Sequence, residues 1–292
     1  METPESQYTN LIRQILEKGS RETSRNGTTL SLFGYSMRFS LQGGALPLLT
    51  TKRVAWKTCF RELQWFIRGS TDNRELQVQD VHIWDGNATP QFLESRGLGE
   101  RGEGDLGPIY GHQWRYFGAP YVDYATDYTG QGVDQLQGII DQLRTEEGRS
   151  SRRLVMSAWN PAQIDEMSLP PCHVLSQFHV RDGKYLSCAL YQRSGDVGLG
   201  VPFNIASYSF LTHLLARHCD LVADEFVYFL GNAHIYEDHI ESLKVQIERP
   251  FFPFPAIEIG QKRDRIEDYN LGDIVWTRPY QCHGSIKMEM VA

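Results

Sequence analysis

Hydrophobic residues recur at helical spacing in several stretches of the chain. Near the start, one face of the segment 8–16 is apolar, and Gly19 follows as a stop signal. The same spacing predicts further helices over residues 56–69, 134–144 and 204–219. The apolar stripe of the first helix is expected to face the core and implies no chemistry.

Between these helices, β-branched, aromatic and leucine residues concentrate in shorter segments. They predict strands over residues 29–41, 152–159, 174–180, 184–193 and 224–231. The pair Asp182-Gly183, between two of them, is a strong hairpin signal. Because strands follow one another by a hairpin as well as through helices, the order indicates an α+β fold with a mixed β-sheet and packed helices. The Gly- and Tyr-rich stretch 94–135 predicts loops and short helices.

The composition fits an ordinary soluble globular protein, with 41% hydrophobic and 22% charged residues among 292. No repeat, low-complexity tract or Pro/Ser-rich linker divides the chain, so we expect one domain over residues 1–292 and not two small ones. The sequence shows neither a signal-peptide pattern nor an apolar run of about 18 residues, so we expect no secretion and no membrane partner.

The net charge and the cysteine content indicate which partners and which cellular compartment to expect. A net charge of −7 argues against a generic duplex-DNA binder, and no nucleic-acid partner is indicated. The five cysteines are widely spaced and form no C-x-x-C pair, which indicates neither a disulfide framework nor a zinc site, and no metal is expected. They favour a reducing compartment, which we expect to be the cytoplasm, with the nucleus as a further location.

Cys172 stands in a stiff context, the segment LPPCHVLSQF. Pro170 and Pro171 restrict the backbone that enters the cysteine, and a predicted strand follows His173 directly. Taken alone, a free cysteine is more often a small buried hydrophobe than a reactive group. A nearby guanidinium would favour a nucleophile, because it lowers the pKa of a thiol and increases the thiolate fraction.

Arginines supply such cations at two strand ends. Arg152 and Arg153 open one predicted strand, and Arg193 with Ser194 closes the strand after the hairpin. Clustered guanidinium groups suit a phosphate monoester, although a solvated arginine pair is an equal alternative for Arg152 and Arg153. Asn204 is either a helix N-cap or a group that reads the O4 and N3–H edge of uracil. The sequence has no P-loop, dinucleotide-binding, zinc-protease or serine-hydrolase motif.

Several segments are each long enough to be specific for a family. They are LTTKRVAWKTCFRELQWFIRGST, HIWDGNA, GDLGPIYGHQWRYFGA, RRLVMSAWNP, LPPCH, LYQRSGDVGLGVPFNIASY, GNAHIYEDHIE and the terminal IKMEMVA. Together they resemble thymidylate synthase, in its eukaryotic-type monofunctional form, from about residue 8 to the end. The resemblance implies a thymidylate synthase-like fold and a homodimer whose subunits meet through a β-sheet face.

The resemblance also implies an activity. A methyltransferase of this family converts dUMP to dTMP, and the co-substrate 5,10-methylenetetrahydrofolate gives both the carbon and the hydride and leaves as dihydrofolate. Cys172 would add to C6 of the uracil ring and so make C5 nucleophilic. The main alternative is a deoxyuridylate hydroxymethylase, in which water quenches the same intermediate. A dCMP-using relative and a catalytically silent binding protein are disfavoured, because Cys172, Arg193 and Asn204 are all present.

The residues that the resemblance implies fall into three groups. The catalytic group is Cys172, with Glu62, Tyr110, His173 and Asp196 for proton transfer and ordered water. The dUMP group is Arg25, Gln192, Arg193, Ser194, Asn204, His234 and Tyr236, with Arg152 and Arg153 reaching the site of the partner subunit. The folate group is Ile83, Trp84, Asn87, Asp196, Phe203 and Ala292. The segment 287–292 would close over both ligands and exclude water.

Four positions depart from the family pattern. The loop with Arg25 is one residue shorter than usual, Asn232 stands in place of Asp, and His112 stands in place of Phe. The last two residues are Val-Ala instead of Ala-Val. Asn232 removes a negative charge beside the expected ribose contacts, and the smaller terminal side chain is expected to close less tightly.

Overall fold

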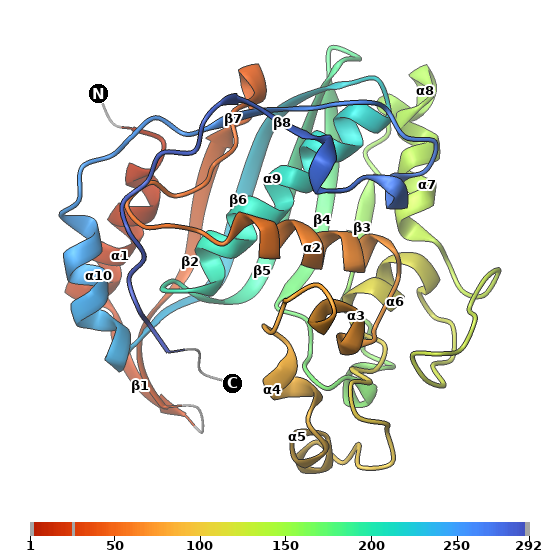
Figure 1. Ribbon diagram of the computed structural model, residues 1–292, viewed down its shortest axis with the longest axis horizontal. Coiled ribbons are helices and arrows are strands. Elements are labelled where there is room, and N and C mark those ends of the chain that lie inside the picture. Colours follow the sequence, from red (N-terminus) through yellow and green to blue (C-terminus); the bar gives the residue numbers. More distant parts are fainter. Residues whose placement is uncertain (1–2, 25–26, 290–292) are drawn as a thin grey trace.

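A six-stranded mixed sheet forms the centre of the fold (Figure 1). The computed structural model describes residues 3–24 and 27–289. In sheet order, the strands are β1 (Ser20–Ser24), β2 (Gly27–Ser40), β6 (Val222–Tyr236), β5 (Tyr185–Asp196), β4 (His173–Arg181) and β3 (Val155–Ser157). Neighbours are antiparallel except β5 and β6, which run parallel. A smaller antiparallel pair joins β7 (Ala256–Ile259) to β8 (Ile274–Arg278).

The hairpin between β4 and β5 forms at the predicted position. Asp182 has φ 53° and Gly183 has φ 65°, so both turn residues adopt the left-handed conformation that a tight hairpin requires. With the packed helices, this mixed sheet confirms the α+β fold class. Within the described residues, no helix is long and apolar enough to cross a membrane.

The described part of the chain contains the following helices, several of which pack against the sheet (Figure 1). They are α1 (Ser6–Lys18), α2 (Trp56–Ile67), α3 (Asn73–Gln77), α4 (Asp85–Ala88), α5 (Pro90–Ser95), α6 (Tyr110–Tyr116), α7 (Gln135–Leu143), α8 (Glu146–Arg149), α9 (Gly200–His218) and α10 (Ile240–Ile247). Helix α9 lies against β5 and β6 and is covered in turn by α2. Because α9 is enclosed between these layers, nearly all of its residues are buried and it shows little amphipathic character.

Two elements differ from the sequence prediction. Helix α9 begins at Gly200, four residues before the predicted start at Asn204, because its first turn contains Val201 and Pro202, both buried. Proline is compatible with the first turn of a helix, where its missing N–H has no partner to lose. Strand β3 is limited to Val155–Ser157, since only these residues pair with β4. The stretch 94–135 contains the short helix α6 and loops, as predicted.

The opposite face of the sheet carries exposed apolar residues. Tyr191 of β5 lies next to Leu175 of β4 and Phe229 of β6, and these side chains are 37–45% exposed. Val155 on β3 and Phe33 on β2 are exposed as well, the latter at 84%. Contiguous apolar surface of this kind is typical of a protein interface.

Gly231 of β6 tests how closely β5 and β6 are packed. A methyl group there would lie 2.7 Å from the carbonyl oxygen of Arg193, which is too close without a shift of the backbone. Gly231→Ala is therefore expected to lower the free energy of unfolding by about 1–3 kcal/mol. Gly138→Ala in α7 is the control, because nothing lies within 4 Å of the added group. Urea denaturation of both variants measures the effect, and equal stability of the two would contradict it.

Candidate active site

The segment that contains Cys172 is held from two sides. Arg193 donates from Nε to the carbonyl oxygen of Pro171 at 2.8 Å and from Nη2 to that of Pro170 at 2.9 Å. Its backbone N–H donates to the carbonyl oxygen of Cys172 at 2.9 Å. Cys172 therefore lies, partly buried, on a backbone that the two prolines and Arg193 fix together at the entry to β4.

The thiol of Cys172 is not activated by its surroundings alone. Burial raises the pKa of Cys172, and the charge of Arg193 lowers it by a smaller amount. The expectation that a nearby guanidinium lowers the pKa of this thiol has the right direction, because the charge of Arg193 does so, but burial outweighs that charge and the net pKa is raised. A proton acceptor has to take the thiol proton when the cysteine reacts.

Tyr110, the first residue of α6, supports the same segment. Its hydroxyl oxygen accepts hydrogen bonds from the backbone N–H groups of Cys172 at 2.7 Å and His173 at 3.3 Å. The ring packs against Phe66 and His173, with centroids 4.7 and 5.0 Å apart. Burial raises the pKa of Tyr110 well above its usual value, so the side chain remains a neutral phenol.

His173 is a buried neutral histidine beside the cysteine. Burial lowers its pKa to about 4, and a hydrogen bond with Asn204 has a smaller opposite effect. Its ring packs on Tyr208 of α9 at a centroid distance of 5.2 Å. Nδ1 is buried and has no hydrogen-bond partner among the described residues.

Glu62 of α2 is a carboxyl group in apolar surroundings. Burial raises its pKa to about 7, while the hydrogen bond from Trp84 Nε1 to Glu62 Oε1, 2.7 Å long, acts in the opposite direction. The ring of Trp84 lies 6.2 Å from that of Tyr110. A carboxyl group with a pKa near neutrality can both give and accept a proton, as general acid–base catalysis requires.

Gln192 and Asn204 form a directed pair of amides. Gln192 Nε2 donates to Asn204 Oδ1 at 3.0 Å and to the carbonyl oxygen of Ser194 at 2.9 Å, while its Oε1 accepts from Tyr228 at 2.5 Å. Because Asn204 Oδ1 accepts the hydrogen bond from Gln192, the oxygen and nitrogen of this amide are assigned, and Nδ2 is the atom that can donate. Asn204 lies inside the first turns of α9, so the N-cap interpretation of this residue is wrong.

The pairing of β5 with β6 aligns three more of the predicted residues, together with Asn232. Ser194 lies opposite Asn232, and Asp196 lies opposite His234. His234 Nδ1 is 3.0 Å from Asn232 Oδ1, and its ring is 5.3 Å from that of Tyr236. Burial lowers the pKa of His234, which favours the neutral ring. Asn232 therefore supplies a hydrogen bond to His234 without adding a negative charge.

A cavity of about 690 Å³ opens beside Asp196. Three residues of the predicted folate group line it, namely Ile83, Asp196 and Phe203. Lining residues that the sequence argument missed include Lys52, Arg53, Asp80, His82 and Gly200, while Met288 belongs to the segment 287–292 that was expected to close over the ligands. The volume and the mixture of apolar walls with a few charged groups suit an organic ligand of drug-like size.

Hydrogen bonds tie the wall of this cavity to the C-terminal segment. Lys52 Nζ donates to the carbonyl oxygen of Gly198, whose N–H donates to Asp196 Oδ1 at 2.8 Å. Burial lowers the pKa of Lys52 to about 8, and the charge of Asp196 raises it by less. His239 lies 3.7 Å from Asp196 through Nδ1, and its Nε2 lies 2.8 Å from the carbonyl oxygen of Glu289. The described end of the chain is therefore anchored at the cavity.

Some of the predicted residues lie elsewhere. Arg152 and Arg153 are exposed ahead of β3, and no side-chain hydrogen bond or ion pair joins them to the site within the described part of their own chain. Trp84 and Asn87 lie at the N-cap and within α4, and neither lines the cavity. Arg25 and Ala292 lie outside the described residues.

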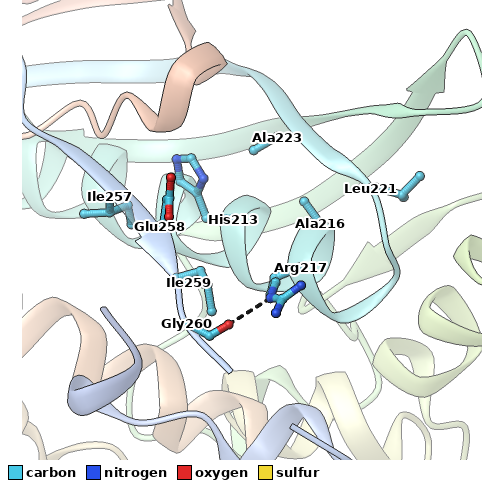
Figure 2. Close-up of a pocket in the computed structure, with 9 residues that line it drawn as sticks. All are labelled: His213, Ala216, Arg217, Leu221, Ala223, Ile257, Glu258, Ile259 and Gly260. Carbon is cyan, nitrogen blue, oxygen red and sulfur yellow. Dashed lines mark hydrogen bonds between the residues drawn. The ribbon is translucent and has the colours of Figure 1, made fainter. Parts of the chain in front are cut away.

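A second cavity, of about 450 Å³, lies between the end of α9 and β7 (Figure 2). None of the predicted site residues lines it. His213 Nε2 contacts the carbonyl oxygen of Ala45 at 2.9 Å, and Arg217 Nε donates to that of Gly260 at 3.0 Å. The contact with Ala45 gives the buried ring of His213 a hydrogen-bond partner within the fold.

The combination of a rigidly held cysteine, amides, histidines and an adjoining cavity defines a group-transfer enzyme that works by covalent catalysis on a bound ring. Over residues 3–24 and 27–289, no group of three His, Cys, Asp or Glu side chains could hold a metal ion. The family model described as thymidylate synthase matches residues 6–292. The chain belongs to the thymidylate synthase family.

The chain is similar to curated thymidylate synthases along almost its full length. It is 52% identical to that of Homo sapiens, over 98% of this chain and 90% of that protein. It is 52% identical to that of Equine herpesvirus 2 (strain 86/87), over 98% of both, and 53% identical to that of Human herpesvirus 8 type P (isolate GK18), over 99% and 85%. The chain spans 54% of the longer bifunctional dihydrofolate reductase-thymidylate synthase of Zea mays, at 49% identity.

Membership of this family confirms the activity expected from the sequence. The chain is a methyltransferase that converts dUMP to dTMP, with 5,10-methylenetetrahydrofolate as co-substrate. Hydroxymethylation of dUMP, the alternative, is not favoured by these similarities.

The pKa of Glu62 gives a test of the site's electrostatics. Because the folded state binds this proton more tightly than the unfolded chain, stability from this group is complete below about pH 4.5 and is lost as the pH rises through about 7. The variant Glu62→Gln has no titratable group at this position. Its free energy of unfolding, relative to the wild type, is therefore expected to increase by about 2–3 kcal/mol between pH 5 and pH 8.

Urea denaturation at several pH values, at one protein concentration, measures this difference. Glu17→Gln is the matched control, because Glu17 is an exposed residue of α1. A flat difference for Glu62→Gln, like that expected for the control, would show that the carboxyl ionises at its ordinary pKa.

Proposed function

We propose that Cys172 is the nucleophile of dUMP methylation in this chain. The observation that carries this assignment is the position of the thiol. It is partly exposed on a fixed backbone, while Cys59, Cys188 and Cys219 are buried. Cys282 is also partly exposed, but only Cys172 is held by Arg193 and Tyr110. A nucleophile needs both access and a defined direction of attack.

In the reaction, the sulfur of Cys172 forms a bond to C6 of the uracil ring, and C5 then attacks the methylene carbon of the folate. One of the two bonds between the methylene carbon and the folate nitrogens breaks as C5 attacks, and loss of the C5 proton then breaks the other, which leaves an exocyclic methylene on C5 and a free tetrahydrofolate. A hydride from this tetrahydrofolate converts the methylene into the methyl group as the C6–sulfur bond breaks, and the folate leaves as dihydrofolate. We assign the proton transfers to Glu62, whose pKa of about 7 suits them. Tyr110 and His173 are neutral hydrogen-bonding groups beside the reacting ring.

The nucleotide is proposed to lie along the ends of β5 and β6. Arg193 and Ser194 would bind the phosphate, together with Arg25, whose fixed charge suits this anion. Asn204, oriented by Gln192, would donate from Nδ2 and accept at Oδ1 against the O4 and N3–H edge of uracil. His234 and Tyr236, adjacent on β6, would bind the ribose hydroxyl.

The folate is proposed to occupy the cavity of about 690 Å³. Phe203 and Ile83 offer apolar surface to its flat ring system, and Asp196, held by the N–H of Gly198, offers a carboxylate at the wall. Trp84 lies outside the lining and donates a hydrogen bond to Glu62. Asn87 and Ala292 complete the proposed folate group. Met288 lines the cavity, which supports a closing role for the segment 287–292.

We also propose a homodimer that buries the apolar face of the sheet. The exposed side chains of Leu175, Tyr191 and Phe229 on neighbouring strands support this arrangement, because water would otherwise cover a contiguous apolar surface. Arg152 and Arg153 lie just before edge strand β3, from which they would reach the phosphate of the partner subunit. The reduced cysteines support the proposed location in the cytoplasm, with the nucleus as a second location.

Product analysis tests the activity and the role of Cys172 together. Wild-type protein incubated with dUMP and methylenetetrahydrofolate should form dTMP and dihydrofolate in equal amounts, measured by mass spectrometry and absorbance. Cys172→Ala should still bind dUMP in calorimetry but form no product. Turnover by this variant would remove Cys172 from the chemistry, and hydroxymethyl-dUMP without dihydrofolate would show that water quenches the intermediate.

The base specificity depends on Asn204. Asn204→Asp should shift the ratio of kcat/KM from dUMP toward dCMP by at least about tenfold, because a carboxyl group can accept from the amino group of cytosine. Steady-state kinetics with both nucleotides provides the measurement. An unchanged ratio would exclude Asn204 from base recognition.

The shared site of the proposed dimer can be tested by mixing inactive variants. Cys172→Ala lacks the nucleophile, and the double variant Arg152→Ala with Arg153→Ala lacks the partner's cations. A dimer of one subunit of each kind contains one site with Cys172 and both arginines. Subunit exchange after mild denaturation should therefore restore about a quarter of the wild-type activity by random pairing. No recovery, with exchange confirmed by mass, would show that the arginines serve their own subunit.

A further inference from the structure

Glu5 is a buried carboxylate that none of the proposed catalytic steps uses. It is only 1% exposed and occupies the N-cap position of α1, but it makes no capping hydrogen bond to its own helix. No ion pair involves it among the described residues. Because a buried carboxylate without hydrogen bonds is strongly unfavourable, its partners indicate what it stabilises.

The carboxylate of Glu5 accepts all of its hydrogen bonds from two consecutive threonines, Thr50 and Thr51. The carboxylate accepts from Thr50 N at 2.9 Å and from Thr50 Oγ1 at 2.5 Å. It also accepts from Thr51 N at 2.9 Å and Thr51 Oγ1 at 2.8 Å. Four donors on one carboxylate fix both the backbone and the side-chain rotamers of this pair.

The threonine pair leads directly into the wall of the folate cavity. Lys52 and Arg53 follow it and line the cavity, and Lys52 also bonds the carbonyl oxygen of Gly198. From the same helix as Glu5, Tyr8 donates to the carbonyl oxygen of Val197 at 2.8 Å. The first turns of α1 therefore contact two chain segments that contribute charged residues to the cavity, one that leads into Lys52 and Arg53 and one that follows Asp196.

The two threonines also accept hydrogen bonds from the C-terminal part of the chain. Thr50 accepts from the N–H of His283 at its carbonyl oxygen, 2.8 Å away. Thr51 accepts from Gln246 Nε2 at Oγ1, 2.9 Å away, and from Arg249 Nη1 at its carbonyl oxygen, 2.8 Å away. Each threonine hydroxyl donates its one proton to Glu5, so the hydroxyl oxygen can only accept further hydrogen bonds. Thr51 Oγ1 accepts one from Gln246.

We propose that Glu5 is a positioning residue for the folate co-substrate. Through Thr50 and Thr51, it holds the cations of Lys52 and Arg53 toward the cavity, where they meet the carboxylates of the folate. Glu5 does not line the cavity, so it acts only through the threonines. The inference rests on the proposed placement of folate in this cavity, and it predicts a selective loss of folate binding.

Glu5→Gln tests the proposal with a side chain of the same size. The amide group has one acceptor oxygen, and its NH2 faces N–H and O–H donors. The KM for methylenetetrahydrofolate should rise about tenfold or more, while kcat and the KM for dUMP stay within about twofold. Thr51→Val should show the same selective change, and Thr51→Ser, which keeps the hydroxyl group, should restore folate binding.

Leu11→Ala is the control for a merely structural role. Leu11 is a buried residue of the same helix, and its truncation should destabilise the protein without raising the KM for folate. Parallel increases in both KM values for Glu5→Gln, or an increase in the folate KM for Leu11→Ala, would overturn the proposal. If Glu5→Gln fails to fold, the comparison of the folate KM between Thr51→Val and Thr51→Ser decides whether the proposal holds.

Calorimetry with tetrahydrofolate separates this proposal from the proposed function, because it requires no turnover. Weaker binding of tetrahydrofolate by Thr51→Val than by Thr51→Ser supports the role of the Glu5 network even if the assigned catalytic residues prove wrong. Equal binding by wild type, Thr51→Val and Glu5→Gln would exclude it, whatever the outcome of the product analysis.

Discussion

The parallel pairing of β5 with β6 is the constraint on which the site depends. Its register places Ser194 beside Asn232 and Asp196 beside His234. Residues about 40 positions apart in the sequence therefore lie side by side on neighbouring strands. A shift by one residue would turn each of these side chains to the opposite face. The close approach of Gly231 to the carbonyl of Arg193 depends on the same register. Arg193 in turn holds the prolines that precede Cys172.

Burial then determines the protonation states of the groups around the cysteine. The pKa of Glu62 rises to about 7 and that of His173 falls to about 4, both chiefly because low-dielectric surroundings disfavour charge. The same effect keeps Tyr110 a phenol and Cys172 a thiol. Tyr110 and His173 are therefore neutral in the free site, whereas Glu62 can both give and accept a proton near neutral pH.

The sequence was informative where local signals coincide with tertiary structure. The stripe 8–16, the Asp182-Gly183 hairpin and the alternation of strands with helices all predicted elements that the structure contains. Long motifs also identified the cysteine, its supporting tyrosine and the amide pair. The sequence indicated that a nearby guanidinium lowers the pKa of Cys172, but not that burial outweighs this effect, because burial depends on tertiary packing that a motif does not reveal. Lys52 and His239 were missed since nothing in their neighbourhood in the sequence signals proximity to Asp196.

The two sides of the site draw on different stretches of the chain. The proposed nucleotide side is built mainly from residues between Tyr110 and Tyr236, whereas the cavity wall is stabilised by Glu5 and by the segment that includes Met288 and Glu289. During synthesis, the strands and helices that carry the first set leave the ribosome well before the second set is complete. A nascent chain could thus assemble its nucleotide side while the cavity still lacks one wall. Because the segment around Met288 and Glu289 follows the nucleotide side in the chain, that wall would be completed later, and co-substrate binding would follow the assembly of the nucleotide side.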